Sequence, residues 1–430
     1  MRETAQPDDV ARPVAKAVDA VVIGAGAAGF LAATRAAERG RRTVLLEKNR
    51  RAGIKILMSG GTRCNLTHAT DRRGIVDAFR TTSGDNAKFL HSPLAALGPD
   101  EVVALFEAEG VATKVESTGK VFPVSNRAVD VQQALLRLLE RSGAELRLGE
   151  AVTDISRSGG NAFHVATTHG AWRAPRVVLA SGGKSYPGCG TTGDGYAWAK
   201  QLGHRIVPPR PALAPLTSGA AWVRELQGVT VPDAAVRIRR AGAESKRNRL
   251  PTYRGGLLFT HFGLSGPTAM NASRAVTERP DADDWRLEVD LAPSAARESL
   301  ERRLADPAAG GTTVGAFAAG LAPRSVAEAV VHNAELPVGQ RLAELSKPGR
   351  RRLLDAVKQT PIPIAGSLGF KKAEVTAGGV DLAGVDSRTL ESRVCPGLFL
   401  VGEVLDLDGP IGGYNFQAAF STGWLAGDSV

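Results

Sequence analysis

Cysteine is scarce in this chain. The 430 residues include three cysteines, Cys64, Cys189 and Cys395, which lie far apart and form no CxxC pair. Seven histidines are also dispersed, with no HxxxH or HExxH spacing. These absences argue against a metal site, an iron–sulfur cluster and a disulfide framework, and they suit a reducing cytosol. We therefore expect no metal and a cytoplasmic protein.

Long apolar runs and blocks of a single charge are absent as well. Residues 1–18 are polar and lack the apolar core of a signal peptide, so we expect a disordered tail. The apolar stretch that follows is interrupted by glycines and is too short to cross a bilayer, which predicts no membrane partner. The net charge is +10, but lysine and arginine are scattered, so a nucleic-acid partner is not the expectation.

The length of the chain predicts two or three domains. Near the N-terminus, residues 19–48 predict a buried strand at 20–23, a helix to about residue 39 and a second buried strand at 43–46. Glu47 follows the second strand, where its carboxylate would accept hydrogen bonds from a ribose diol and reject a 2′-phosphate. This order of elements is typical of a dinucleotide-binding βαβ unit.

The turn between the first strand and the helix has the sequence GAGAAG. Gly24 permits a tight turn, Gly26 lets the backbone approach a pyrophosphate, and Gly29 lets the helix pack closely on the strand. Ala27 and Ala28 lie at the helix N-terminus, which offers free N–H groups and a positive dipole end to phosphates. We expect these residues to bind the cofactor; the alternative is a parallel-sheet turn that binds nothing.

Residues 48–68 form a Gly-rich segment with many polar donors, which we expect to be a loop. Cationic and backbone N–H groups suit a pyrophosphate or an anionic substrate. Apolar residues in its middle argue against an ordinary solvated loop. Its cofactor-binding candidates are Lys48, Lys55, Ser59, Gly60, Gly61, Arg63 and Asn65.

Another strand, predicted at residues 171–179, ends in small residues, and ligands of open α/β sheets lie at such carboxyl ends. Val152 lies on a segment that returns toward the sheet, and such segments reach the adenine by backbone contacts. The candidates from this region are Val152, Ser181, Gly182 and Gly183.

A second GxGxxG pattern, at Gly188, Gly190 and Gly193, does not directly follow a strand. We therefore reject it as a second nucleotide site. A helix is predicted to begin near Asp194, which allows this loop to line the cofactor instead.

Prolines from residue 208 mark a change to alternating β-structure and then to helices, which lasts to residue 365. A strand at 395–402, an acidic residue, a Gly-rich turn and a helix at 416–426 then repeat the first pattern. The helix N-terminus again favours a ligand with negative charge. The candidates here are Gly402, Glu403, Gly412, Gly413, Tyr414 and Asn415.

These motifs occur together as GAGAAG, IKILMSGGTRCNLTH, ASGGKSYPGCGTTGDGYAWAKQLGH, GGLLFTHFGLSGP, EVTAGGV and LFLVGEVLDLDGPIGGYNFQAAFSTGWLAG. As a set they resemble the BaiN-like family (YhiN, aminoacetone-oxidase type) of FAD-binding flavoproteins, which is related more distantly to fumarate reductase flavoproteins. The resemblance extends from about residue 18 to the C-terminus.

The resemblance implies an α/β fold. A glutathione-reductase-like FAD domain, of the two-dinucleotide-binding (Rossmann) type, is assembled from residues 19–207 and 366–430. Residues 208–365 are an inserted β-rich and helical region on the substrate side. It also implies noncovalent FAD, with the ADP half held by Gly24, Gly26, Gly29 and Glu47. Ser59, Gly60, Arg63 and Asn65 would lie near the flavin and pyrophosphate. Residues 402–403 and 412–415 would reach the ribityl chain and the ring. Ile54 and Thr62 depart from the family pattern.

A flavin supplies redox chemistry, so the protein has to place a substrate carbon near N5 and provide a proton donor or acceptor. His261 and Arg63 are the catalytic candidates, because each lies in a Gly-rich family motif; His261 is equally well interpreted as a hydrogen-bonded loop histidine. Cys64, beside Arg63, is a candidate for a lowered thiol pKa. The expectation is an FAD-dependent oxidoreductase that acts on a small organic substrate by hydride transfer at N5, with NAD(P)H, if used, binding transiently.

Two alternatives remain open. The basic charge favours a flavin-containing RNA-binding protein, similar in cofactor architecture to tRNA-modifying flavoproteins, whose affinity would fall steeply with salt. A non-enzymatic redox sensor that only holds FAD is the other. The sequence leaves the substrate and the oligomeric state open.

Overall fold

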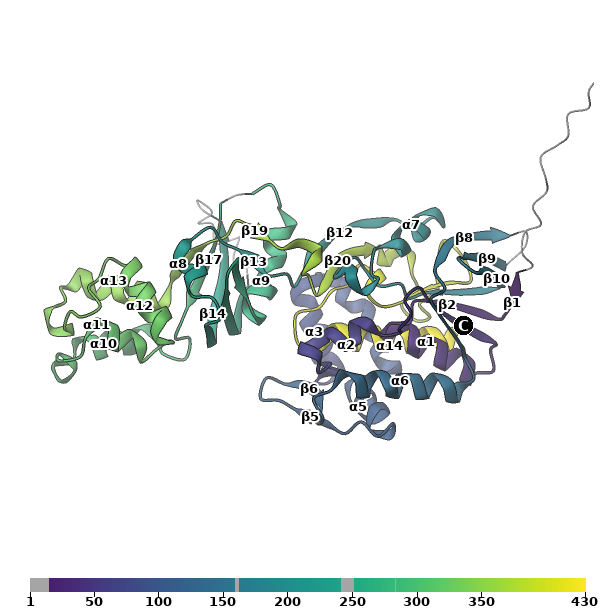
Figure 1. Cartoon of the computed structure of the whole chain (residues 1–430), viewed down its shortest axis with the longest axis horizontal. Coiled ribbons are helices and arrows are strands. Elements are labelled where there is room, and N and C mark those ends of the chain that lie inside the picture. Colours follow the sequence, from purple (N-terminus) through teal and green to yellow (C-terminus); the bar gives the residue numbers. More distant parts are fainter. Residues whose placement is uncertain (1–14, 159–161, 241–250, 283) are drawn as a thin grey trace, which may run out of the picture. The chain divides into compact units, whose positions relative to one another are not determined.

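The structure is a computed structural model that describes residues 15–158, 162–240, 251–282 and 284–430. These residues form two compact units. Unit 1 contains residues 1–183, 189–208 and 378–430, and unit 2 contains residues 184–188 and 209–377. The chain leaves unit 1 along β12 (Ile206–Ala212) and returns along β20 (Val375–Val380), and these two strands pair with each other. The first and last parts of the sequence, purple and yellow in Figure 1, therefore belong to one unit.

Unit 1 is built on a parallel sheet of five strands in the order β21-β11-β2-β3-β7. Four of its strands are apolar and buried, as is usual for parallel sheets whose two faces are covered, whereas the edge strand β7 is partly exposed. Val21, Val44, Val178 and Leu398 are completely buried. The strands are β2 (Ala20–Ile23), β3 (Thr43–Glu47), β7 (Glu145–Leu148), β11 (Arg176–Leu179) and β21 (Leu398–Leu400).

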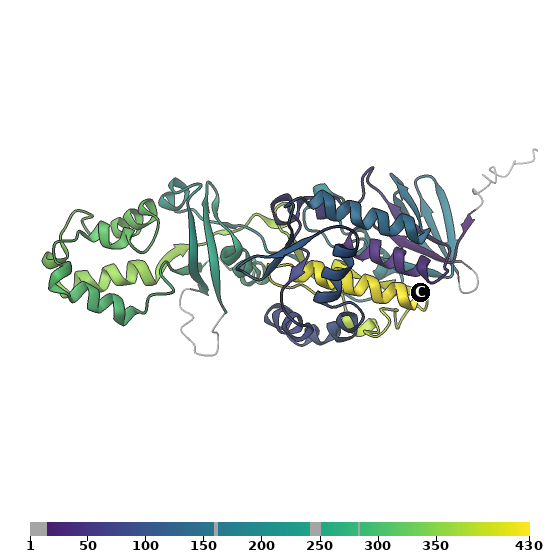
Figure 2. The same cartoon turned by 90° about the horizontal axis from the view of Figure 1, so that it is seen from below.

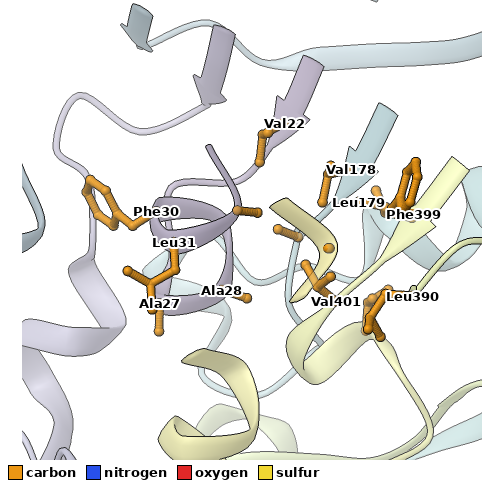
Figure 3. Close-up of a cluster of buried hydrophobic side chains, with 14 of the residues drawn as sticks. Val22, Ala27, Ala28, Phe30, Leu31, Val178, Leu179, Leu390, Phe399 and Val401 are labelled. Atoms are coloured by element: carbon orange, nitrogen blue, oxygen red, sulfur yellow. The ribbon is translucent and has the colours of Figure 1, made fainter. Parts of the chain in front are cut away.

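Three helices cover one face of this sheet. Figure 2 shows the purple α1 (Ala27–Glu38) between the yellow α14 (Tyr414–Ser429) and the blue α6 (Ala128–Ser142), and α1 contacts both. Side chains of α1 meet those of β2, β11 and β21 in one buried cluster, which Figure 3 shows around Phe30, Leu31 and Val178. The helix that follows the GAGAAG turn is thereby fixed against the sheet.

Two smaller sheets complete unit 1. The sheet β1-β10-β9-β8 lies on the side of the parallel sheet away from α1 (Figure 1). Its strands are β1 (Lys16–Ala17), β8 (Val152–Ser158), β9 (Ala162–Thr167) and β10 (Gly170–Ala174). The sheet β4-β6-β5 consists of β4 (Thr67–His68), β5 (Thr113–Val115) and β6 (Lys120–Pro123). The remaining helical segments of unit 1 are α2 (Ile54–Thr62), α3 (Arg72–Ser83), η1 (Gly84–Leu90), α4 (His91–Ala96), α5 (Pro99–Ala108), α7 (Asp194–Gln201), η7 (Leu382–Gly384) and η8 (Gly402–Val404).

Unit 2 is built on a sheet of seven strands in the order β18-β17-β14-β15-β16-β13-β19. One apolar core joins this sheet to α9 and to residues of α12 and α13, and a second core lies among the helices that follow β17. The strands are β13 (Leu216–Thr217), β14 (Thr230–Arg240), β15 (Thr252–Thr260), β16 (Gly263–Ser265), β17 (Trp285–Asp290), β18 (Thr360–Pro363) and β19 (Gly366–Ser367). The helices are α8 (Ala221–Glu225), α9 (Pro267–Glu278), α10 (Arg297–Ala305), α11 (Val314–Ala319), α12 (Arg324–Asn333) and α13 (Lys347–Lys358), with 3₁₀ turns at η4 (Pro307–Ala309), η5 (Leu342–Glu344) and η6 (Gly369–Lys371).

The structure differs from the sequence-based expectations at four places. Residues 366–377 belong to unit 2, because β19 pairs with β13, so the return to unit 1 comes at residue 378 instead of 366. Of the expected N-terminal tail, residues 1–14 lie outside the described residues, whereas β1 pairs with β10. The expected strand at 171–179 is broken at Pro175 into β10 and β11, which join different sheets.

The fourth difference is that the expected loop at 48–68 contains α2.

In the part of the chain that the structure describes, no helix is both long and apolar enough to cross a membrane.

Candidate functional site

The GAGAAG turn has the close contacts that its glycines predict. Gly24 has a φ of +102°, and a Cβ there would lie 2.6 Å from the carbonyl oxygen of Ala180. A Cβ on Gly29 would lie 1.9 Å from the carbonyl oxygen of Gly24. Gly26 differs, because a Cβ built on it would meet no described atom within 4 Å apart from those of its own local chain. The turn is therefore tightly packed at Gly24 and Gly29 and open at Gly26, where a pyrophosphate would approach.

Glu47 supports this turn directly. Its buried carboxylate accepts hydrogen bonds from the backbone N–H of Ala25 (2.9 Å) through one oxygen, and from the backbone N–H (2.9 Å) and side-chain amide (2.7 Å) of Asn49 through the other. Glu47 thus holds the backbone before α1, in addition to the ribose contact expected from the sequence. Within the described residues no side chain caps α1 and no acidic residue lies in its first turn, which leaves the helix N-terminus to an anion.

The helix α2 is interrupted at the glycines that the sequence singles out. Ser59, Gly60 and Gly61 have non-helical backbone angles, and Gly60 and Gly61 have φ values of +56° and +68°. A Cβ on Gly60 would lie 3.0 Å from the ring of Phe122 and 3.2 Å from the backbone nitrogen of Asn65. These close contacts and the positive φ explain why glycine stands at position 60, because a side chain there would meet Phe122 and the backbone of Asn65.

Asn65 brings this segment to the N-terminus of α14. Its side chain is buried, and its amide oxygen has no hydrogen-bond partner within the described part of the chain. A Cβ on Gly413, the residue before α14, would lie 2.8 Å from that oxygen. A buried acceptor without a partner is costly, so this atom faces a place where a donor is missing.

The Gly-rich turn before α14 is shaped by Asn415. Its side-chain oxygen accepts from the backbone N–H of Gly409 (2.8 Å), and its side-chain nitrogen donates to the carbonyl oxygen of Gly409 (2.9 Å). Gly412 and Gly413 have φ values of +140° and +94°. Asn415 therefore closes the turn, and among the described residues no side chain caps the first N–H groups of α14.

His68 and Tyr414 stack on each other beside this turn. Their ring centroids lie 4.7 Å apart at 20°, and His68 Nδ1 lies 3.1 Å from the carbonyl oxygen of Gly412. Burial raises the pKa of Tyr414. A Cβ on Gly119 would lie 2.4 Å from His68 Nε2, so the hairpin β5–β6 holds the imidazole from its other side. His68 thereby joins two turns that the sequence separates widely.

Arg63 lies at the end of α2, where its guanidinium pairs with Glu116 at 2.6 Å and stacks on Phe122 at 4.0 Å. Glu116 comes from the turn of the β5–β6 hairpin, and nothing in its sequence context predicts this contact. Lys55 and Glu403, both expected cofactor residues, form an ion pair at 2.5 Å. The side chain of Lys48 pairs with Asp194 at 2.6 Å.

Ser181 and Gly182 follow β11, as the sequence predicts. The Ser181 hydroxyl is buried and has no hydrogen-bond partner in the residues that the structure covers. Val152 begins β8 opposite Thr167. Gly402 has a φ of +70° and donates its N–H to the hydroxyl of Thr422 on α14.

The comparisons with known proteins settle the family. The model described as HI0933-like protein Rossmann domain matches residues 18–429. A protein from Escherichia coli (strain K12) named ribosomal RNA dihydrouridine synthase is 32% identical over 421 residues, covering 96% of this chain and 98% of its own. A 3-dehydro-bile acid delta(4,6)-reductase from Clostridium scindens is 32% identical over 414 residues, covering 94% and 97%. The chain belongs to the HI0933-like family.

A solved structure, the open conformation of a flavocytochrome c3 fumarate reductase, covers 97% of this chain and 78% of its own, with a TM-score of 0.50 and 17% identity. This likeness concerns the fold alone. The resemblance to BaiN-like flavoproteins and the Rossmann-type α/β fold are thus both confirmed. The HI0933-like chain is an FAD-dependent oxidoreductase.

The residues of this HI0933-like chain fit FAD. The open position at Gly26 and the uncapped N-terminus of α1 follow β2. The buried hydroxyl of Ser181 follows β11, and the uncapped N-terminus of α14 comes after β21. The buried oxygen of Asn65 borders α14. The carboxyl ends of neighbouring parallel strands meet at one edge of a sheet, which is where such folds bind dinucleotides. The pyrophosphate would meet α1 and the flavin would meet α14.

The structure places His261 and Arg63 in different units and buries Cys64 completely. His261 lies in the turn between β15 and β16 of unit 2, exposed and edge-on to Phe262, whereas Arg63 belongs to unit 1. The expectation of a lowered pKa for Cys64 is wrong: complete burial raises the pKa of its thiol to about 12. Cys64 is therefore a structural residue despite its place beside Arg63.

Proposed function

We propose that the protein is an NAD(P)H-fed flavin reductase that saturates a carbon–carbon double bond conjugated with a carbonyl group. The observation that carries this proposal is that two 32% identical relatives, which match almost end to end, have names that describe such a reduction. Dihydrouridine is uridine whose ring double bond, conjugated with a carbonyl, has gained two hydrogens. A 3-dehydro delta(4,6) bile acid has double bonds conjugated with a ring ketone. The shared chemistry is more informative than either molecule.

When bound, FAD supplies a hydride through its N5 atom, with NAD(P)H as the source of electrons. Addition of that hydride to the far carbon of the conjugated bond and of a proton to the near carbon balances the reaction. The chain's own residues have to neutralise the charge that develops on the carbonyl and to exclude water. Glu116 and Phe122 hold the guanidinium of Arg63 in place, so Arg63 can offer a positive charge to such an oxygen. The N-terminus of α14 favours negative charge on the flavin ring.

The reaction also needs a side chain that donates the proton. Burial raises the pKa of Tyr414 and so favours its protonated form, which can donate a hydrogen bond and a proton. His68 contacts the Tyr414 ring and holds it in place. We propose Tyr414 as a donor candidate, in addition to His261 and Arg63, the catalytic candidates expected from the sequence.

The test is an anaerobic reduction of the purified holoenzyme followed by re-oxidation. NADH or NADPH should bleach the flavin absorption, and an α,β-unsaturated ketone should restore it. A matched ketone with an isolated double bond should not, because it cannot stabilise charge on the carbonyl. A flavin that stays oxidised with both nucleotides, or that is re-oxidised equally by both ketones, would contradict the proposal.

A second candidate places the same conjugated bond in RNA. The relative named ribosomal RNA dihydrouridine synthase and the net charge of +10 favour it. In this case the reduced holoenzyme would be re-oxidised by ribosomal RNA lacking dihydrouridine, the affinity would fall steeply with salt, and the digested RNA would contain a nucleoside heavier by two hydrogens. If a free enone re-oxidises the reduced flavin and RNA does not, the substrate is a small molecule.

A further inference from the structure

Residues 189–194, which we call the strap, cross the edge of the parallel sheet where the dinucleotide is expected. At the end of β3, Lys48 Nζ lies 2.7 Å from Thr192 Oγ1 and 2.6 Å from Asp194 Oδ2. The side-chain amide of Asn49 donates to the carbonyl oxygen of Cys189 at 3.1 Å. The strap is therefore fastened to the two residues that directly follow Glu47.

The same segment also reaches the end of β11. A Cβ on Gly182 would lie 3.0 Å from the methyl group of Thr191, and a Cβ on Gly195, which follows the strap, would lie 2.1 Å from Ser181 Oγ. In the sheet, β2 lies between β11 and β3. A segment that contacts both neighbours at their carboxyl ends has to pass the carboxyl end of β2, where the GAGAAG turn begins.

The strap fits Lys48 and Asn49 closely. Gly190 has a φ of +91°, and a Cβ there would lie 2.6 Å from the side-chain nitrogen of Asn49 and 3.2 Å from Lys48 Cε. Cys189 Sγ lies 3.2 Å from Met58 Sδ on α2. Gly190 of the second glycine motif is thus explained by packing across the strand end.

We propose that the strap closes the dinucleotide site and that the Lys48–Asp194 ion pair is a clasp that sets how fast FAD enters and leaves. Lys48 and Asp194 are positioning residues, because they act through the strap. Their side chains are 32% and 44% exposed, so water competes with the pair and the clasp can open without unfolding the unit. The proposal concerns FAD exchange and stands whether or not conjugated double bonds are the substrate.

The experiment follows FAD binding to the apoprotein, and FAD release on dilution, by flavin fluorescence. Lys48→Ala is expected to speed both association and release about fivefold and to leave the dissociation constant nearly unchanged, because a clasp slows both directions alike. Lys88→Ala is the matched control. It removes a lysine from an exposed ion pair with Asp85 (3.0 Å) on η1, and it should retain the wild-type rates.

Direct contact of Lys48 with FAD gives a different pattern. In that case Lys48→Ala would speed release without speeding association, and the dissociation constant would rise, which overturns the clasp. The charge-swapped double variant Lys48→Glu, Asp194→Lys distinguishes the clasp from direct contact of Lys48 with FAD. A clasp predicts that slow exchange returns, whereas fast release in the swapped protein would show that the lysine itself is needed at position 48.

The salt dependence of FAD release from the holoenzyme provides a second measurement. Salt screens partly exposed ion pairs, so the release rate of wild-type FAD should rise with ionic strength, while the release rate of Lys48→Ala should rise less. Equal salt dependence in the two proteins would overturn the proposal.

Discussion

Lys55 and Glu403 form an ion pair, with 2.5 Å between Lys55 Nζ and Glu403 Oε2, that joins the first turn of α2 to the segment after β21. The two residues are 348 positions apart in the sequence. Their side chains are 29% and 19% exposed, so each charge is largely removed from water. Removing one partner would take a charge-assisted hydrogen bond away from a half-buried site.

Glu403→Gln is therefore expected to lower the free energy of unfolding of the apoprotein by about 1–2 kcal/mol. Urea denaturation measures it, and Lys88→Ala at an exposed pair should change it by less than about 0.5 kcal/mol. In a double-mutant cycle with Lys55→Met, the two effects should be strongly non-additive. Simple additivity would show that the pair contributes nothing of its own.

Gly26→Ala and Gly423→Ala should separate cofactor binding from packing. A Cβ on Gly26 meets open space, so this variant should keep the apoprotein's melting temperature but bind FAD at least about tenfold more weakly, since its methyl group occupies the approach to the pyrophosphate. A Cβ on Gly423 would lie 2.2 Å from the carbonyl oxygen of Ala28, which forces α14 away from α1.

Gly423→Ala is accordingly expected to cost about 1–3 kcal/mol of apoprotein stability. Calorimetry of both apoproteins and FAD titration provide the comparison. If Gly26→Ala loses stability but its folded fraction still binds FAD with the wild-type affinity, the pyrophosphate does not bind at this turn.

Glu47→Ala tests the second role found for this carboxylate. Without it, the backbone N–H of Ala25 and the two donors of Asn49 lose their buried acceptor, so the apoprotein should lose about 2 kcal/mol before any effect on the ribose is counted. Chemical denaturation without FAD measures this loss. An apoprotein as stable as the wild type would mean that Glu47 serves the cofactor alone.

Cys64 predicts a dependence of stability on alkaline pH. The thiol pKa is raised to about 12 in the folded protein, whereas the unfolded chain loses this proton near pH 8.5. Above that pH the folded state holds more protons than the unfolded state, so stability falls as pH rises, by about 1.4 kcal/mol per pH unit. The contribution is fully present below pH 8.5.

The measurement is the free energy of unfolding between pH 8 and pH 11 for the wild type and Cys64→Ala. The difference between their slopes isolates this thiol from other groups that titrate there. Parallel curves would show that the buried thiol ionises as easily as a free one. Slow alkylation of native Cys64 at pH 8 is expected for the same reason.

Much of the cofactor half of the molecule is determined by the sequence itself. The GAGAAG turn, the strands on each side and the helix that follows are local features, because apolar runs, helix periodicity and glycine conformations act within a few residues. The same holds for the turn and helix at the C-terminus, where α14 begins two residues earlier than expected. Family membership followed from these motifs and was confirmed.

Only the tertiary structure decided how these pieces meet. Arg63 with Glu116, Lys48 with Asp194 and the His68–Tyr414 stack are contacts between residues whose chemistry is visible in the sequence but whose partners are not. The need for glycine at position 60 has the same origin, since Phe122 of a distant hairpin occupies the space that a side chain there would need. Local propensity specifies elements, whereas side-chain pairing depends on which strand ends and turns the packed core brings to one place.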